Sequence, residues 1–319
     1  MEELRDLRRR IRSVRSTQHI TQAMSLVAST RLRRIERLVG PARAYAETLK
    51  GIVLDIAART PPWAHPLLEP REAATRACLV ITSDRGLAGS YNAEILRKAT
   101  RLLGTADPVR NNVAVVVAGK KGRDFFRRRG LQPVREYVRL PETPDESLAR
   151  RIAEDLLARY LEGEIDSVHV VFARFMSRGS YRPHIAQLLP IEGRRLAARR
   201  DEAQSPVTGN ENDRVEVGEG AGPARDTGSP NGLDLQFVYE PSPESVLDRL
   251  FPHYLASAVY AALVEAKASE FAARTIAMDS ATDNAGELIE RLTLTYNRAR
   301  QAEITQEISE IATGAESLR

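Results

Sequence analysis

The residues best placed for chemistry lie in a glycine-containing loop, Ser83–Asn92, which reads Ser-Asp-Arg-Gly-Leu-Ala-Gly-Ser-Tyr-Asn. The loop follows an apolar segment typical of a strand and precedes a helical segment, where phosphate-binding loops occur. It lacks both the Gly-Lys-Ser/Thr ending of a P-loop and the three-glycine spacing of a dinucleotide-binding turn. We therefore expect a tight turn that uses Gly86 and Gly89, with a polar cap on the next helix, in preference to a nucleotide site.

Other reactive side chains are scattered along the chain. No two of the five histidines have the three- or four-residue spacing of a helical metal site, and no Gly-x-Ser-x-Gly nucleophile signature occurs. The single cysteine, Cys78, excludes an intramolecular disulfide and is expected to be a small buried residue of a strand. The sequence thus predicts no cofactor, no metal ion and no catalytic residue, although acid–base catalysis by a pair of carboxylates stays open.

The elements that would carry these residues begin with an N-terminal helix over residues 1–59. Mostly apolar residues recur along this helix at alternating intervals of three and four positions and form a continuous seam. Such a seam predicts a left-handed coiled coil with a partner helix. The partner is the alanine-rich segment 241–319, and its greater length predicts a single-helix tip beyond the N-terminus. Two amphipathic helices on a globular core are the alternative. The seam consists of Leu4, Leu7, Ile11, Val14, Gln18, Thr21, Ser25, Ala28, Leu32, Ile35, Val39, Ala42, Ala46, Leu49, Val53 and Ile56.

Between the two helices, residues 72–191 alternate strand-like and helix-like segments, which is typical of a doubly wound, Rossmann-like α/β domain with a largely parallel sheet. Strands are predicted at 77–83, 113–118, 168–175 and 185–191, and helices at 91–103, 121–129 and 147–161. Residues 192–232 contain no aromatic and few aliphatic side chains, so we expect a disordered insertion there.

The charge of the chain is unevenly distributed. The formal net charge is only +4, but residues 1–43 hold eleven arginines, which suits an acidic partner such as nucleic acid or an acidic protein surface. No aromatic residue precedes Tyr45, so the stacking platforms of single-strand binders are missing there. No segment is apolar enough to span a bilayer and the N-terminus does not read as a signal peptide, so we expect the protein to stay in the compartment where it is made.

Several separate blocks of the chain resemble the gamma subunit of F-type ATP synthases. The opening helix at 4–28 reads LRDLRRRIRSVRSTQHITQAMSLVA, and the loop at 81–92 reads ITSDRGLAGSYN. The C-terminal part at 277–315 reads AMDSATDNAGELIERLTLTYNRARQAEITQEISEIATGA, and EPSPESVLDRLFPHYL at 240–255 and QLLP at 187–190 match as well. Departures from the family pattern are Gln22, Leu26, a Gly40-Pro41 break and the 192–232 insertion.

The resemblance implies a rotor shaft without catalytic activity of its own. Its partners would be the alpha, beta and epsilon subunits and the c-ring, at the cytoplasmic face of the cell membrane, and the coupling ion would be a proton or sodium. The residues implied to contact alpha and beta subunits are Arg8, Arg9, Arg12, Met24, Gln301, Thr305 and Glu307. Those implied to belong to the foot, on the side of the c-ring and epsilon, are Asp84, Arg85, Gly86, Gly89 and Asn92.

Two other functions remain open at this point. A basic helical hairpin that binds nucleic acid would show binding that weakens steeply with salt. A nucleotide-dependent α/β enzyme would show saturable nucleotide binding by the isolated chain.

Overall fold

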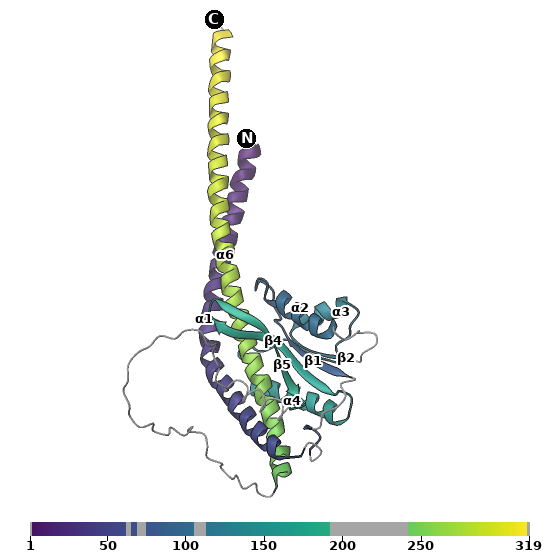
Figure 1. Ribbon diagram of the computed structural model, residues 1–319. Coiled ribbons are helices and arrows are strands. Elements are labelled where there is room, and N and C mark those ends of the chain that lie inside the picture. The colour runs from purple at the N-terminus through teal and green to yellow at the C-terminus, as the bar shows by residue number, and fades with distance from the viewer. Residues whose placement is uncertain (1, 62–64, 69–74, 105–112, 192–241, 318–319) are drawn as a thin grey trace, which may run out of the picture.

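The molecule consists of a two-helix shaft with an α/β domain attached to its side. The computed structural model describes residues 2–61, 65–68, 75–104, 113–191 and 242–317, and the predicted insertion at 192–232 lies outside these ranges. Helix α1 spans Glu2–Arg59 and helix α6 spans Pro243–Ser317. Figure 1 shows both chain termini at the same end of the shaft, with α6 extending past the start of α1.

The two helices run antiparallel. The side chain of Arg8 donates to Tyr296, and near the other end of the shaft Arg43 donates to Glu265. The sixteen predicted seam positions are all buried or half-buried, which confirms the coiled coil. Helix α1 continues through Gly40 and Pro41, as the predicted helix over 1–59 requires, although this pair departs from the family pattern. Both of these residues are exposed, and the seam continues beneath them.

The domain between the helices contains one five-stranded sheet with the order β3-β2-β1-β4-β5. Strands β1, β2, β3 and β4 are parallel, and β5 forms an antiparallel hairpin with β4. The bounds are Arg76–Ile81 for β1, Val113–Ala118 for β2, Arg135–Tyr137 for β3, Ser167–Ser177 for β4 and Ser180–Leu189 for β5.

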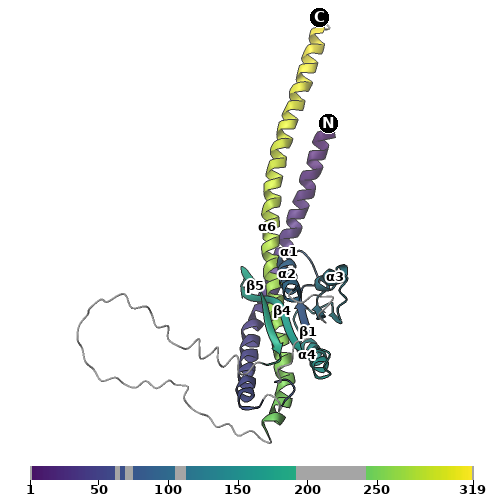
Figure 2. The same cartoon turned by 45° about the vertical axis from the view of Figure 1, so that its right-hand side comes forward.

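Helices cover both faces of the sheet, as the doubly wound prediction requires. Helices α2 (Tyr91–Gly104) and α3 (Lys120–Arg128) lie on one face, and α4 (Glu146–Leu161) lies on the other together with the shaft (Figures 1 and 2). Side chains of β1 alternate between the two cores: Cys78 and Val80 pack toward α2, while Leu79 and Ile81 pack toward α4 and α6. The described helices include none that is long and apolar enough to cross a membrane.

Candidate functional site

The predicted loop after β1 is a tight turn at the place where the α/β domain meets the shaft. Its two ends are joined by Asn92, whose side chain accepts from the Ser83 backbone N–H at 3.0 Å and donates to Ser83 Oγ at 2.8 Å. Gly89 has φ of 53°, as expected of a turn glycine, but the second left-handed residue is Leu87 and not Gly86. The Gly86 carbonyl instead accepts a hydrogen bond from Arg274 of α6 at 3.3 Å.

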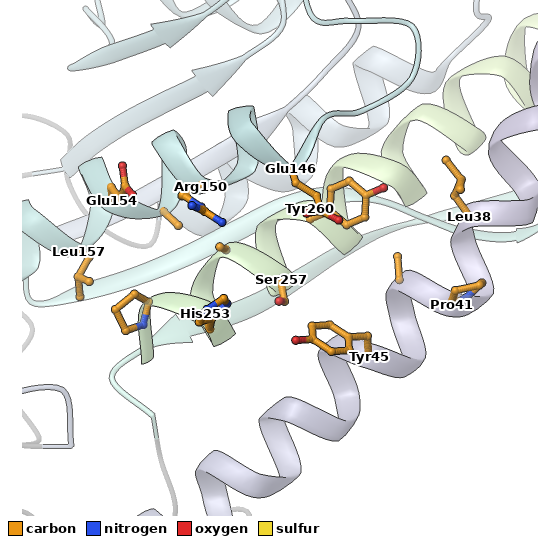
Figure 3. A pocket seen from close by; sticks show the side chains of 14 residues that line it. Leu38, Pro41, Tyr45, Glu146, Arg150, Glu154, Leu157, His253, Ser257 and Tyr260 are labelled. Atoms are coloured by element: carbon orange, nitrogen blue, oxygen red, sulfur yellow. The ribbon is translucent and has the colours of Figure 1, made fainter. Parts of the chain in front are cut away.

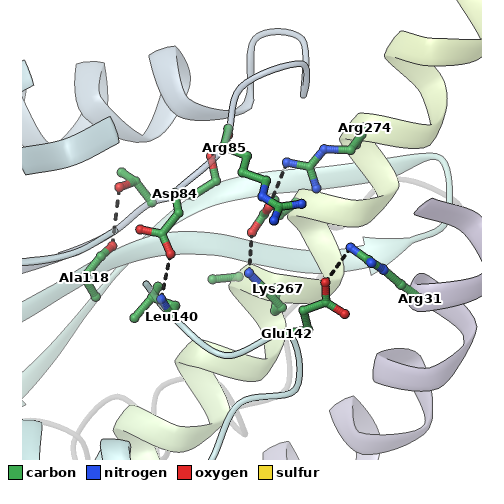
Figure 4. A network of polar contacts seen from close by, with 12 residues as sticks. Arg31, Asp84, Arg85, Ala118, Leu140, Glu142, Lys267 and Arg274 are labelled. Atoms are coloured by element: carbon green, nitrogen blue, oxygen red, sulfur yellow. Dashed lines mark hydrogen bonds and ion pairs between the residues drawn. The ribbon is translucent and has the colours of Figure 1, made fainter. Parts of the chain in front are cut away.

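Asp84 joins the ends of three strands through the backbone. Its carboxylate accepts hydrogen bonds from the N–H groups of Lys120 at 2.8 Å, Leu140 at 2.6 Å and Arg139 at 3.2 Å, which follow β2 and β3. Figure 4 shows the bond to Leu140. Arg139 itself has φ of 59°. The sequence indicated Asp84 but not these partners, because backbone donors have no residue signature.

A buried ionic network on α6 faces the same loop. Glu270 is 4% exposed, and its two carboxylate oxygens bind Lys267 at 3.0 Å and Arg274 at 2.8 Å. Arg274 also holds the Gly86 carbonyl, so the network fastens the loop to the shaft (Figure 4). In the sequence these three residues are indistinguishable from the charges of a solvated helix face, so they were not predicted as part of a site.

Helix α6 also occupies the crevice in which doubly wound proteins bind their ligands, at the carboxyl ends of the strands where the strand order reverses. Tyr91 Oη donates to the carbonyl of Ala266 at 2.9 Å, and Ser269 Oγ donates to the carbonyl of Ala173 in β4 at 3.0 Å. Burial, with the nearby Glu270 carboxylate, raises the pKa of Tyr91 well above its ordinary value, so the phenol remains a donor. The cavity left beside Tyr91 and Ala266 has a volume of about 10 Å³, room for about one water molecule and not for a nucleotide.

A larger pocket of about 700 Å³ lies between α1, the loop and α6. It brings together Met24, predicted as a contact of alpha and beta subunits, with Asp84, Arg85 and Gly86, predicted as residues of the foot. Gly89 and Asn92 are not among its lining residues, because Asn92 is turned toward Ser83. The pocket has an apolar wall and a charged rim. The wall comprises Ile20, Met24, Val27, Leu87 and Phe271, and the rim comprises Arg31, Asp84, Arg85, Arg139, Glu142, Lys267, Glu270 and Arg274.

The rim of this pocket has an excess of positive charge, because four arginines and one lysine face one aspartate and two glutamates. The three carboxylates are already engaged, with Glu142 binding Arg31 at 2.6 Å. Neither Arg85 nor the side chain of Arg139 forms an ion pair with another described residue, and both are exposed. The arrangement can attract an acidic group that carries an apolar surface.

A second pocket, of about 580 Å³, lies lower on the shaft between α1, α4 and α6. Tyr45 lies across its opening from Ser257, and Glu146 and Tyr260 lie at the same end (Figure 3). Burial, with the Glu146 and Asp145 carboxylates as smaller causes, raises the pKa of Tyr260. This pocket was not predicted, because its residues come from three elements that are far apart in the sequence.

The other predicted contact residues lie on the free part of the shaft, away from these pockets. All of them are exposed: Arg8, Arg9, Arg12, Gln301, Thr305 and Glu307. Arg8 Nη2 donates to Tyr296 Oη at 2.6 Å across the two helices. Thr305 Oγ1 donates to the Gln301 carbonyl within α6. The arginines and the tip residues therefore do not form one site with Met24. Within the described ranges, no three histidine, cysteine or carboxylate side chains gather as a metal site would require.

These features define an elongated helical shaft protein with an α/β domain at one side, in which the usual ligand crevice of that domain is filled by the shaft. The family model described as ATP synthase matches residues 3–318. The ATP synthase gamma chain of Desulforamulus reducens is 44% identical over 320 residues, and that of Heliobacterium modesticaldum is 42% identical over 318 residues, each match covering 100% of both chains. The chain belongs to the ATP synthase gamma chain family.

Solved structures show the same fold. A chain of the Euglena gracilis mitochondrial ATP synthase rotor has a TM-score of 0.62 at 18% identity, with 95% of this chain and 99% of that chain covered. A chain of the Tetrahymena thermophila mitochondrial ATP synthase central stalk and c-ring has a TM-score of 0.57 at 24% identity, with 82% of this chain and 99% of that chain covered. The predicted family and fold class are confirmed, and the nucleic-acid alternative has no support among these proteins.

Proposed function

We propose that this protein is the central rotor shaft of an F-type ATP synthase. It couples ion-driven rotation of the membrane c-ring to ATP synthesis and hydrolysis at the beta subunits of an alpha/beta hexamer. The observation that carries the proposal is the identity of 44% over the whole chain to an ATP synthase gamma chain, combined with a shaft whose seam is continuous over α1. Rigid rotation of such a shaft is a recognised way to couple distant sites.

The proposed division of labour follows the elements. Residues 1–59 and 241–319 form the shaft, and residues 72–191 form the foot that stands on the c-ring with the epsilon subunit. Helix α6 has 75 residues, which at a rise of about 1.5 Å per residue gives a length of about 110 Å. Two helices wound together give the lower shaft stiffness, whereas the end of α6 continues alone as a slim tip (Figure 2). Attachment to the membrane is indirect, at its cytoplasmic face, through the ring.

The protein is proposed to be non-catalytic. The support is that α6 fills the strand-end crevice and leaves only about 10 Å³ beside Tyr91. The active sites would then lie on the beta subunits, and the role of this chain would be to move them in sequence.

The pocket at Met24 is the proposed place where an acidic loop of a beta subunit approaches the shaft. Its apolar wall and its excess of cations suit such a partner, and Arg85 and Arg139 are the charges with no ion pair to a described residue. Farther up, Arg8, Arg9 and Arg12 and the tip residues Gln301, Thr305 and Glu307 are proposed to face alpha and beta subunits.

Reconstitution tests the function directly. Purified alpha and beta subunits are assayed for ATP hydrolysis with and without this chain, and we expect rapid steady-state hydrolysis only with it. Hydrolysis by the chain alone, or no stimulation of an assembled complex, would contradict the proposal. For the pocket, Arg85→Gln/Arg139→Gln should lower turnover, whereas the control Arg97→Gln/Arg101→Gln, which removes two charges from exposed positions of α2, should not.

A further inference from the structure

The β4–β5 hairpin carries a side chain that belongs to the core of the shaft. Phe175 of β4 is 7% exposed and packs in a separate hydrophobic cluster whose other buried members are all residues of the two shaft helices. They are Leu32, Ile35, Val39, Val264, Ala268, Phe271 and Ala272. A residue of the foot is therefore inserted between α1 and α6.

An ion pair between a half-buried arginine and a buried glutamate surrounds the backbone of this same residue. Glu265 of α6 is 5% exposed and accepts from Arg43 of α1 through both oxygens, with Oε1 at 2.9 Å from Nε and Oε2 at 2.8 Å from Nη2. Glu265 Oε2 also accepts from the Phe175 N–H at 3.1 Å, and Arg43 Nη2 donates to the Phe175 carbonyl at 3.0 Å. The Glu265 carboxylate raises the pKa of Arg43. One ion pair thus holds α1, α6 and the hairpin together.

Two exposed ion pairs continue the connection to α1. Arg178, in the turn between β4 and β5, binds Glu36 at 2.9 Å, and Arg174 lies 3.8 Å from Glu47. Such surface pairs contribute little to stability by themselves. Their position is informative, because they lie on both sides of the Arg43–Glu265 pair along α1.

We propose that Arg43, Glu265 and Phe175 form the joint that transmits torque between the foot and the shaft, and that they fix the angular position of the foot on both helices. This inference rests on the proposed rotor function. The contacts of Tyr91 and Arg274 join the foot to α6. The exposed Arg31–Glu142 pair joins it to α1, whereas Arg43, Glu265 and Phe175 connect both helices and the foot at one point. A foot held on one helix could turn that helix about its partner, whereas a joint to both helices turns the coiled coil as one body.

The Arg43–Glu265 ion pair is better suited to fixing the orientation of the foot on the shaft than to raising the free energy of unfolding. The Glu265 carboxylate is buried and the Arg43 side chain is half-buried, so the loss of hydration offsets part of the attraction between the charges, and apolar residues can often replace such a pair without loss of stability. Pulling the pair apart would leave an uncompensated buried charge, so the pair resists displacement strongly. Its bidentate geometry also fixes an orientation, which an apolar contact does not.

The test compares two activities of the same variants. ATP hydrolysis by the complex of alpha, beta and this chain requires the upper shaft and leaves the foot without a load. ATP-driven ion pumping by the holoenzyme in membrane vesicles loads the foot through the ring. The double variant Arg43→Met/Glu265→Gln removes both charges and retains a side-chain acceptor for the Phe175 N–H. We expect its hydrolysis in the subcomplex to match the wild type and its ions pumped per ATP hydrolysed to fall several-fold.

A matched control and a milder variant keep the result interpretable. Glu136→Gln breaks the Arg127–Glu136 pair, which lies within the foot between α3 and β3, and should change neither activity. Phe175→Leu keeps an apolar side chain in the shaft core and should lower the pumping ratio less than the double variant does.

The outcomes separate the two proposals. A wild-type ratio of ions pumped per ATP in the double variant would overturn the torque joint. A proportional loss of hydrolysis and pumping would also overturn it, as would a failure of both joint variants to assemble, because each of these two results indicates a purely structural role. If the wild-type chain does not stimulate hydrolysis, the rotor function itself is wrong.

Discussion

Replacement of Gly119 by alanine should disrupt the edge of the sheet that carries Asp84. Gly119 directly follows β2 and has φ of 112°, and its N–H donates to the Tyr137 carbonyl at 2.7 Å. A Cβ atom at this position would lie 2.2 Å from the Thr82 backbone oxygen, so the ends of β1 and β2 would have to move apart. The next residue, Lys120, supplies one of the N–H groups bound by Asp84, so the disturbance reaches the pocket.

The size of the effect follows from two costs. Backbone strain in a sparsely populated region costs about 1–3 kcal/mol, and forcing an extra carbon into a packed site costs about 1–3 kcal/mol. The sum for Gly119→Ala is about 2–6 kcal/mol of unfolding free energy. Gly130 is a matched control: its φ is 76°, but no atom lies within 4 Å of the position that an added methyl group would take. Gly130→Ala should therefore cost only about 1–2 kcal/mol.

Hydrogen exchange measured by mass spectrometry on the purified chain reports this difference locally. We expect peptides from β1, β2 and β3 to lose protection in Gly119→Ala, while peptides from the free end of the shaft exchange as in the wild type. Equal effects of the two alanine substitutions would refute the reasoning, because the steric contact with Thr82 would then contribute nothing.

Three further predictions concern other parts of the chain. Burial raises the pKa of the Cys78 thiol from 9.0 to about 12. The contribution of the neutral thiol to the free energy of unfolding is therefore complete below about pH 9 and is lost as the pH rises to about 12. Thiol reagents should label Cys78 only upon unfolding. At the tip, Gln301→Leu or Glu307→Ala should remove a polar contact worth about 0.5–1.5 kcal/mol and lower ATP turnover by the complex several-fold without loss of helicity. Unchanged ATP turnover in both variants would indicate that the tip rotates without transmitting torque through these contacts. Deletion of 194–229, chosen for its low apolar content, should leave assembly and hydrolysis intact, and failed assembly would contradict this expectation.

The shaft could be predicted from the sequence because its signal is local and repeated. Sixteen seam positions specify one face of α1, and every one of them is buried or half-buried. Segment 113–118 was likewise predicted with its correct bounds, since a fully apolar run marks a strand buried on both faces.

The elements that were missed are those whose sequence carries little apolar pattern. Strand β3 has three residues, none of them buried, and was not predicted. Strand β5 begins at Ser180 and not at 185, because its first half is polar and half-exposed and is held by pairing with β4. Such strands form through backbone hydrogen bonds to a neighbour, which composition does not reveal.

The site could be predicted only in part, for a related reason. The sequence indicated Met24 and the loop at Asp84 separately, but their meeting in one pocket depends on the register between α1 and the foot. Arg43 and Glu265 are 222 positions apart, and each alone reads as an ordinary charge on a helix face. Contacts between such distant residues need the fold before they can be recognised.

The polar residues in the middle of the seam explain how that register is specified. A seam of small apolar residues can slip by a heptad at little cost, whereas one buried polar layer selects a single alignment. Thr21 meets Thr282 at 2.7 Å, and Ser25 donates to Asp279 at 2.5 Å. A slip of seven residues would place Ser25 opposite Ala272 or Gly286, neither of which offers a side-chain acceptor. The weakest part of the heptad pattern is therefore the part that aligns Met24 with the foot.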